Sequence, residues 1–428
     1  MPNLPMPQPP RPSHASPIAA VFLAGVLVTA GTSFAQHGVR KPDNPAYARM
    51  PEPVATSGEL STIVETNFTP GNVAVTPSGR LFLSMHPFGA PEIRVVEVLR
   101  NGSLRAYPTD DWAHSVGESG VGIQSIIGLR SDPKGVLWML DAGNLGSASP
   151  GTPATPPKLI AWDTNGERLQ RVVHIPPPAA TPKSFLQDLA IDWKREVIFI
   201  ADCGIGQGFA DATPAIVVVY LRTGMSRRIL ENAACVRAEE PAAMVIDGRE
   251  VQSRRPDGTL ETPKVGINPI TIDAACEWVY FGSMHGTSIY RVKAEDLANP
   301  GLPREELERR IVRHGPKGVS DGIAIDANGT IYVTDVNANA IGALTQDGTY
   351  SILHRDDTLL SWPDGLCIGH DGNVYVTVNQ LHRHAPLNRG ESETTPPYRV
   401  LRFPPLVAQP PVPQPAVPQP AVPKPAVP

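Results

Sequence analysis

Polar side chains recur at one position of a sequence pattern that is repeated six times along the chain. In each copy the residue lies just before a short apolar stretch, and five of the six residues are polar. Amide and carboxylate groups that converge on one axis suit a small polar or cationic ligand, or a hard metal ion. The alternative is that these side chains cap strand ends and bond to the backbone. In chain order the residues are Gly71, Ser125, Gln187, Asn268, Asp321 and Asp364.

The repeated pattern predicts the strands that must position these residues. Each copy is an apolar stretch, a turn and a second apolar stretch rich in Val, Ile, Tyr, Phe and Trp. The clearest copies are DGIAIDANGTIYVTD from Asp321 and DGLCIGHDGNVYVTV from Asp364. Repeats that consist of short strands without a helical pattern are typical of β-propellers, whose blades need neighbours to bury their faces. We therefore predict an all-β, six-bladed β-propeller.

The first strand of each copy should be the innermost of its blade, because it is short and apolar on both faces. The residue before it would then face the central channel. We therefore predict that Gln187, Asn268, Asp321 and Asp364 bind a ligand there. The sequence assigns no catalytic residue and no metal ligand, because it contains no zinc spacing, nucleophile elbow, phosphate loop or dinucleotide fingerprint in a supporting context.

Histidines and cysteines are weaker candidates. His86 and His285 follow similar strands and could approach each other across the channel, although a lone histidine at a strand end is usually structural. The HRH segment at 382–384 is expected to be a solvated loop. Cys203 and Cys235 flank a strand pair and could form a disulfide bond, since an exported location permits one.

Composition is consistent with one large globular core. The chain has 428 residues, of which 41% are hydrophobic and 18% charged, and its net charge is −5. Lysine and arginine are scattered along the sequence rather than clustered. Binding to nucleic acid is therefore not expected.

The N-terminal segment, residues 1–35, has the features of an export signal. The apolar run IAAVFLAGVLVTA is 13 residues long, too short to span a bilayer comfortably, and Ser33-Phe34-Ala35 supplies small residues for cleavage. An uncleaved membrane anchor is the alternative. We expect a secreted or periplasmic protein with no membrane span after the signal is removed.

The remaining boundaries follow from composition. We expect an N-terminal extension at 36–54, the propeller at 55–403 and a Pro-rich tail at 404–428. Proline at the density of the tail forces an extended polyproline conformation that joins neither sheet nor core. The tail is expected to be a stiff spacer or a contact to the cell surface, or to have no partner.

Four segments, in order, resemble the major royal jelly protein/yellow family across roughly residues 60–403. They are LWMLDAGNLGSASPGTPATPPKLIAWDTNGERLQRVVHIP, YLRTGMSRRILEN, GINPITIDAACEWVYFGSMHGTSIYRV and WPDGLCIGHDGNVYVTVNQLHR. The resemblance implies a six-bladed propeller and an exported protein with a ligand-accommodating channel. Members of the family include insect proteins linked to dopachrome conversion and others that bind biogenic amines. By its place in VTVNQLHR, Asn379 is implied to be a channel-facing ligand contact.

The sequence also departs from the family pattern. A family cysteine is replaced in the segment Thr155-Pro156-Pro157-Lys158, and its partner is missing near Arg195. The family disulfide pattern is therefore not expected here. The signal segment and the Pro-rich tail are of a bacterial type, so an insect pigment role is not transferred.

Three functions remain open. The first is binding of a small polar or amine ligand, with or without a tautomerase-like or isomerase-like activity, and it needs no cofactor. The second is a metal-dependent lactone hydrolase of the gluconolactonase type, suggested by Pro363-Asp364-Gly365. That chemistry needs a divalent cation and a glutamate in the first blade, where Gly71 and Asn72 stand instead. The third is a scaffold that binds another protein.

Overall fold

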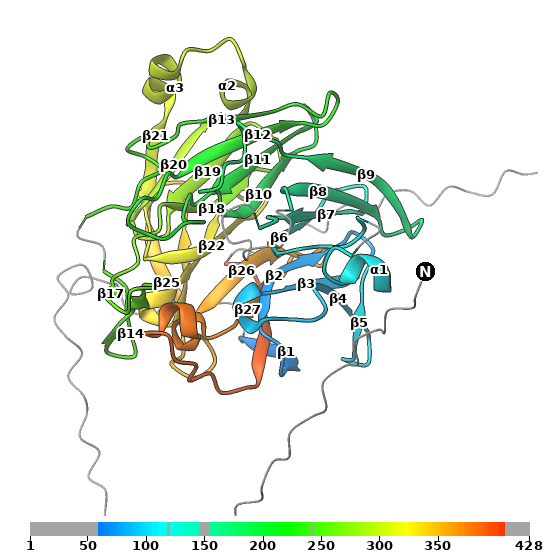
Figure 1. Cartoon of the computed structure of the whole chain (residues 1–428), viewed down its shortest axis with the longest axis vertical. Helices are drawn as coiled ribbons and strands as arrows, with labels where there is room; N and C mark the ends of the chain where they lie inside the picture. Colours follow the sequence, from blue (N-terminus) through cyan, green and yellow to red (C-terminus); the bar gives the residue numbers. More distant parts are fainter. Residues whose placement is uncertain (1–58, 118–119, 145–154, 241–242, 407–428) are drawn as a thin grey trace, which may run out of the picture. The chain divides into compact units, whose positions relative to one another are not determined.

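The structure is a computed structural model, and the residues it describes are 59–117, 120–144, 155–240 and 243–406. The predicted signal segment and the N-terminal extension lie outside these ranges, as does the Pro-rich tail from 407 on. The described residues form six four-stranded antiparallel sheets arranged as blades (Figure 1). The prediction of an all-β, six-bladed propeller is confirmed.

Each blade consists of an inner strand and three strands that follow it outward. Their bounds, from the inner strand, are β2 (Pro70–Val75), β3 (Leu81–Met85), β4 (Val95–Val98), β5 (Leu104–Ala106) in blade 1; β6 (Ile126–Ser131), β7 (Val136–Asp141), β8 (Lys158–Asp163), β9 (Arg168–His174) in blade 2; β10 (Leu186–Asp192), β11 (Val197–Asp202), β12 (Ala215–Tyr220), β13 (Ser226–Ile229) in blade 3; β18 (Ile267–Ile272), β19 (Trp278–Ser283), β20 (Ser288–Lys293), β21 (Val312–Pro316) in blade 4; β22 (Ser320–Ile325), β23 (Ile331–Asp335), β24 (Ala340–Leu344), β25 (Tyr350–Arg355) in blade 5; and β26 (Pro363–Ile368), β27 (Val374–Val378), β28 (Tyr398–Phe403), β1 (Ser61–Thr66) in blade 6.

The ring is closed by strands from the two ends of the described chain. β1 pairs antiparallel with β28, with Ser61 opposite Arg402 and Thr66 opposite Tyr398. Inner strands of consecutive blades lie against one another all the way around, including β26 against β2. Blade 6 is therefore complete only when β1 has joined it.

Apolar side chains fill the space between neighbouring blades. Six clusters, one at each junction, bury residues from both blades, such as Phe199 of blade 3 and Phe281 of blade 4. Because each sheet covers its neighbour, no blade can bury both of its faces alone.

A bulge at the start of every inner strand aims side chains at the channel. In each blade the pairing of the inner strand with the next strand shifts register within its first few residues. The shifts lie at Pro70/Val73, Ile126/Leu129, Leu186/Asp188, Ile267/Ile270, Ser320/Ile323 and Pro363/Leu366. The predicted ligand-binding residues of β10, β18, β22 and β26 are the second residues of these strands.

Short elements join and cover the blades. Two hairpins, β14 (Val245–Ile246) with β15 (Arg249–Glu250) and β16 (Ser253–Arg254) with β17 (Leu260–Glu261), interrupt the connection between blades 3 and 4. The short helices are η1 (Pro87–Gly89), α1 (Asp110–Ala113), α2 (Ala294–Ala298), α3 (Arg304–Arg310), η2 (Val336–Ala338), η3 (Leu381–Arg383) and η4 (Ala385–Leu387). Within the described ranges, no helix is long and apolar enough to cross a membrane.

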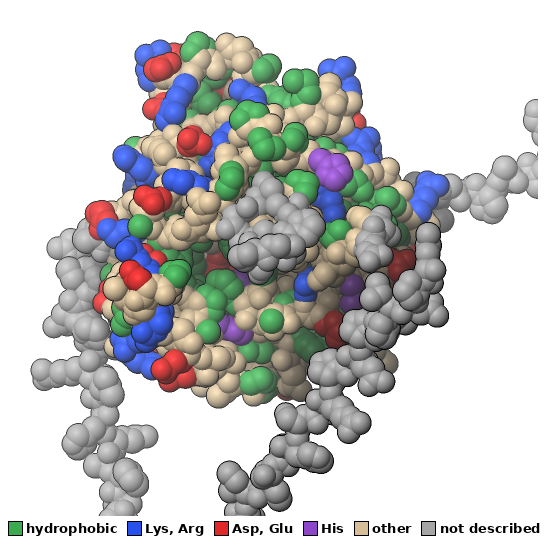
Figure 2. Space-filling view, viewed as in Figure 1, with side chains coloured by type: hydrophobic (Ala, Val, Ile, Leu, Met, Phe, Trp, Pro, Cys, Tyr) green, Lys and Arg blue, Asp and Glu red, His purple; other side chains and the backbone are tan. Residues whose placement is uncertain are grey.

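The visible surface carries charges of both signs, and the cysteines, all within the described ranges, form no disulfide bond. Figure 2 shows positive and negative side chains interspersed over the visible face. The cysteines of the chain are free thiols. Cys203 and Cys235 do not form the disulfide considered above, because Cys203 lines a cavity while Cys235 packs against the cluster between blades 3 and 4.

Candidate functional site

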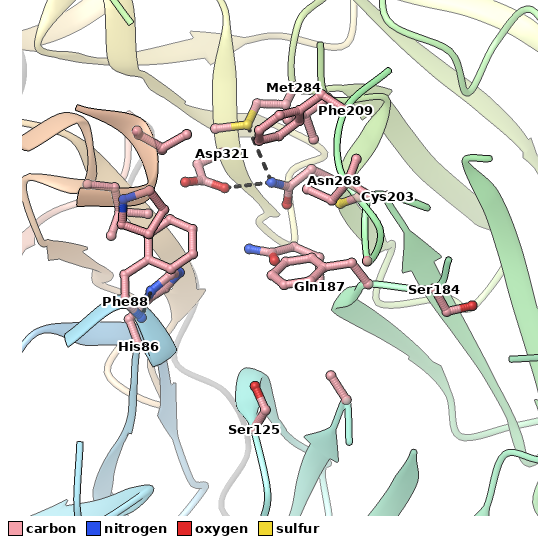
Figure 3. A pocket seen from close by; sticks show the side chains of 18 of the residues that line it. His86, Phe88, Ser125, Ser184, Gln187, Cys203, Phe209, Asn268, Met284 and Asp321 are labelled. Atoms are coloured by element: carbon pink, nitrogen blue, oxygen red, sulfur yellow. Dashed lines mark hydrogen bonds between the residues drawn. The ribbon is translucent and has the colours of Figure 1, made fainter. Parts of the chain in front are cut away.

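A cavity of about 280 Å³ lies where the inner ends of the blades meet the connecting loops (Figure 3). Part of its wall is aromatic and comes from Phe88, Phe185, Phe209 and Trp362. Its polar lining includes three of the predicted ligand-binding residues, Gln187, Asn268 and Asp321. A mostly apolar hollow with a few polar groups is the usual form of a small-molecule site.

Asp321 is the only acidic side chain among the cavity-lining residues that the structure describes. Its carboxylate accepts hydrogen bonds from Asn268 Nδ2 at 2.7 Å and from Trp362 Nε1 at 2.7 Å. Burial raises the pKa of Asp321 to about 6, although the two hydrogen bonds act in the opposite direction and lower it. Both donors are neutral, so they orient the carboxylate without neutralising its charge.

Two amides beside Asp321 have unused hydrogen-bonding capacity. Asn268 Oδ1 is buried and has no hydrogen-bond partner among the described residues. Gln187, which is 5% exposed, extends from β10 into the cavity alongside Asn268 (Figure 3). A buried acceptor without a partner costs roughly 1–3 kcal/mol, so a ligand that donates to it gains that interaction.

The other two predicted residues do not line this cavity. Asn379 is fully buried, and its Nδ2 donates to Asp364 Oδ2 at 2.6 Å and to the Pro70 carbonyl at 2.9 Å. It therefore joins blade 6 to blade 1 and holds Asp364 in place. Burial and the charges of Asp321 and Asp188 raise the pKa of Asp364 well above its ordinary value.

One arginine, which sequence reasoning did not single out, crosses the channel. Arg130 of β6 donates to Asn72 Oδ1 at 3.0 Å, to the Leu366 carbonyl at 3.2 Å and to Asp188. It thereby connects blade 2 with blades 1, 3 and 6. Burial raises the pKa of Asp188 to about 6 although Arg130 opposes the shift.

The balance of charge in the channel is negative. Asp188, Asp321 and Asp364 are buried and close enough for their charges to affect one another's pKa values. Among the residues that the structure describes, Arg130 forms an ion pair only with Asp188. Because like charges in a buried site repel, the channel favours an additional cation or protonation of a carboxyl group.

The structure assigns different places to the histidines singled out from the sequence. His86 lines the cavity, whereas His285 accepts a bond from the Val265 N–H at 3.0 Å and does not reach it. The prediction that residues 382–384 are solvated is wrong, because His382 and His384 are buried. His382 stacks on Trp362 at 5.9 Å and contacts Asp247 of the inserted hairpins, which cover this loop.

Comparisons with known proteins give distant structural likenesses. No curated protein matches the chain. Solved structures that are similar include a gluconolactonase from Xanthomonas campestris, at 11% identity over 81% of this chain and 90% of that chain with a TM-score of 0.49. A streptogramin B lyase is 14% identical over 81% of this chain and 97% of its own, with a TM-score of 0.42. A luciferin-regenerating enzyme is 11% identical over 81% of this chain and 94% of its own, with a TM-score of 0.49. Likenesses this distant carry no inference about activity.

The family comparison is more informative. The profile of the major royal jelly protein family matches residues 124–395. The match begins just before the inner strand of blade 2 and includes the cavity residues of blades 3, 4 and 5. Since it covers more than half of the sequence, the chain belongs to the major royal jelly protein family.

Proposed function

We propose that the protein binds a small organic amine in the cavity, with the ammonium group at Asp321 and the apolar part of the ligand against the aromatic wall. The observation that carries this proposal is a buried carboxylate that has no cationic partner among the described residues, in a cavity lined by four aromatic side chains. Ammonium groups are attracted both to carboxylates and to aromatic faces. The free Oδ1 of Asn268 supplies a further acceptor for an N–H donor.

The surplus of negative charge favours a cation over a neutral ligand of equal shape. A cation at Asp321 reduces the repulsion among the three channel carboxylates, whereas an alcohol leaves it unchanged. Binding to the folded state alone stabilises the protein by about 2.7 kcal/mol at a ligand concentration of one hundred times Kd. The ligand should therefore raise the melting temperature.

A second candidate function, proton transfer on the bound ligand as in a tautomerase, is favoured by one observation. The pKa of Asp321 is raised to about 6, close to the pH at which a general acid or base works best. A lactone hydrolase is less favoured, because a Cβ at Gly71 would lie 2.9 Å from Ser84 Oγ. The side chain of the required glutamate does not fit there without rearrangement.

The test compares ligands that differ in charge but little in shape. Calorimetry and melting are measured with phenethylamine, 2-phenylethanol and phenylacetate. We expect phenethylamine to bind and the other two to bind at least tenfold more weakly. Asp321→Asn should remove most of the preference for the amine, while Asp347→Asn, the same change at an exposed turn, should keep it. Equal binding of amine and alcohol, or full amine binding by Asp321→Asn, would contradict the proposal.

Export belongs to the same proposal. Residues 1–35 would direct the chain out of the cytoplasm, where the cavity meets extracellular or periplasmic ligands, and the Pro-rich tail would contact the cell surface. Cell fractionation with and without residues 404–428 tests the second part. Release of the protein from cells should increase when the tail is removed, and an unchanged distribution would contradict a surface contact.

A further inference from the structure

His86 is a buried imidazole with a fixed orientation at the cavity wall. It follows β3 in blade 1, is 2% exposed and donates its backbone N–H to the Thr69 carbonyl at 2.8 Å. Its Nδ1 accepts the N–H of Phe88 at 3.1 Å and so caps η1. Its ring meets that of Phe88 edge to face, with centroids 4.6 Å apart. These contacts leave the ring little freedom to rotate.

The bond at Nδ1 determines which nitrogen carries the proton. Because Nδ1 uses its lone pair as an acceptor, the proton of the neutral ring must be on Nε2. Burial and the nearby His384 lower the pKa of His86 to about 3, so the ring is neutral at physiological pH. No described residue forms a hydrogen bond with Nε2. Because His86 lines the cavity, it contributes to the wall an N–H group that donates but neither accepts nor carries charge.

We infer that His86 recognises a hydrogen-bond acceptor on the ligand, so that the cavity selects amines that also carry an oxygen over amines whose remainder is hydrocarbon. This inference rests on the proposed function. His86 comes from blade 1 and Asn268 from blade 4, which are opposite each other in a ring of six, and Figure 3 shows the two side chains on different sides of the cavity. Because both side chains line the same cavity of about 280 Å³, a small ligand in that cavity has access to both.

The chemistry of the acceptor follows from the tautomer. An ether or carbonyl oxygen suffices, because His86 does not need a donor in return. A hydrocarbon at this place would cover the N–H and leave it without a partner. A site built around a hydrogen bond discriminates against such a ligand. An oxygen lost from the ligand is thus expected to lower affinity about fivefold, the equivalent of about 1 kcal/mol.

The experiment uses phenethylamine and its 2-, 3- and 4-methoxy derivatives, which hold an ether oxygen at three distances from the ammonium group. Affinities are measured by calorimetry for the wild type, His86→Asn and His86→Phe. Asparagine retains an acceptor that can cap η1, and phenylalanine retains a ring, so the two variants disturb the fold in different ways. In the wild type at least one methoxy isomer should bind about fivefold more tightly than phenethylamine. In both variants that ratio should fall to within twofold of one.

Two results would overturn the inference while amine binding stands. The first is the absence of any preferred isomer in the wild type. The second is a ratio that survives in both variants; if it survives while the affinity for all four amines falls equally, His86 only shapes the wall. Failure of phenethylamine itself to bind the wild type would refute the proposed function, and the inference with it.

Discussion

Replacing Asp364 with asparagine should stabilise the unliganded protein at neutral pH. Asp364 accepts a bond from Asn379 Nδ2, while Asn379 Oδ1 on the same amide is buried without a partner among the described residues. The introduced amide could keep the first bond through its oxygen and donate its own N–H to Asn379 Oδ1. Satisfying a buried acceptor is worth about 1–3 kcal/mol. The same change also removes one of the mutually repelling carboxylates.

The gain should depend on pH in a defined direction. The pKa of Asp364 is raised in the folded state, so its contribution to stability is fully present below the pKa of the unfolded chain and is lost as pH rises through the folded pKa. The advantage of Asp364→Asn should therefore be smaller at pH 4 and larger at pH 8. For roughly 340 ordered residues the unfolding entropy is about 0.7 kcal/mol per degree, so 2 kcal/mol corresponds to about 3 °C.

Differential scanning calorimetry and urea unfolding at pH 4, 6 and 8 test this reasoning. Asp347→Asn is the matched control, since Asp347 is exposed and its pKa is lowered by bonds from Thr345 and Thr349. The control should show no gain at pH 8. An Asp364→Asn protein that melts below the wild type at pH 8, or gains equally at pH 4 and pH 8, would refute the account of the channel.

Four further predictions follow from the channel and the ring. Amine affinity should rise from pH 5 to pH 8, because Asp321, with a pKa of about 6, must ionise; a flat calorimetric profile would contradict this. Arg130→Met should lower the free energy of unfolding, measured with urea, by about 3–5 kcal/mol at pH 8, since it leaves Asp188 unpaired. The loss should be smaller at pH 5, where Asp188 is protonated. Deleting the chain from Ser361 on removes the partner of β1 and should abolish cooperative unfolding; a single sharp transition would speak against one closed ring. N-terminal sequencing of the native protein should show cleavage after Ala35, and a soluble form that retains Met1 would refute export.

The ring of blades and part of the cavity were predictable because they depend on local pattern. An inner strand apolar on both faces is visible in a window of six residues, and so is the polar residue at its start. The symmetry of the ring then brings such residues from neighbouring blades together, as with Asn268 and Asp321. Gln187 reaches the same cavity for the same reason.

The remainder of the site depends on contacts between segments far apart in the sequence. Phe88, Phe185 and Phe209 lie outside the named strands, and the aromatic wall that they form with Trp362 combines residues of blades 1, 3 and 6. In the sequence Arg130 is one polar residue near the end of an apolar strand. The neighbouring residues do not indicate that its side chain extends to Asp188. His382 follows β27 in a polar segment, and it is buried by Trp362, on which it stacks, and by the hairpins inserted between blades 3 and 4.

The pairing of β1 with β28 also has a consequence for protein synthesis. Roughly 330 residues separate the two strands, and a ribosome needs about 15 to 70 s to add them. During that time the hydrogen-bonding edge of β1 has no partner, although it is one of the first strands made. Blades 1 to 5 have all of their strands before β28 is complete. The last strand to be synthesised is therefore the one that shields the first, so closure of the ring must follow translation of nearly the whole propeller.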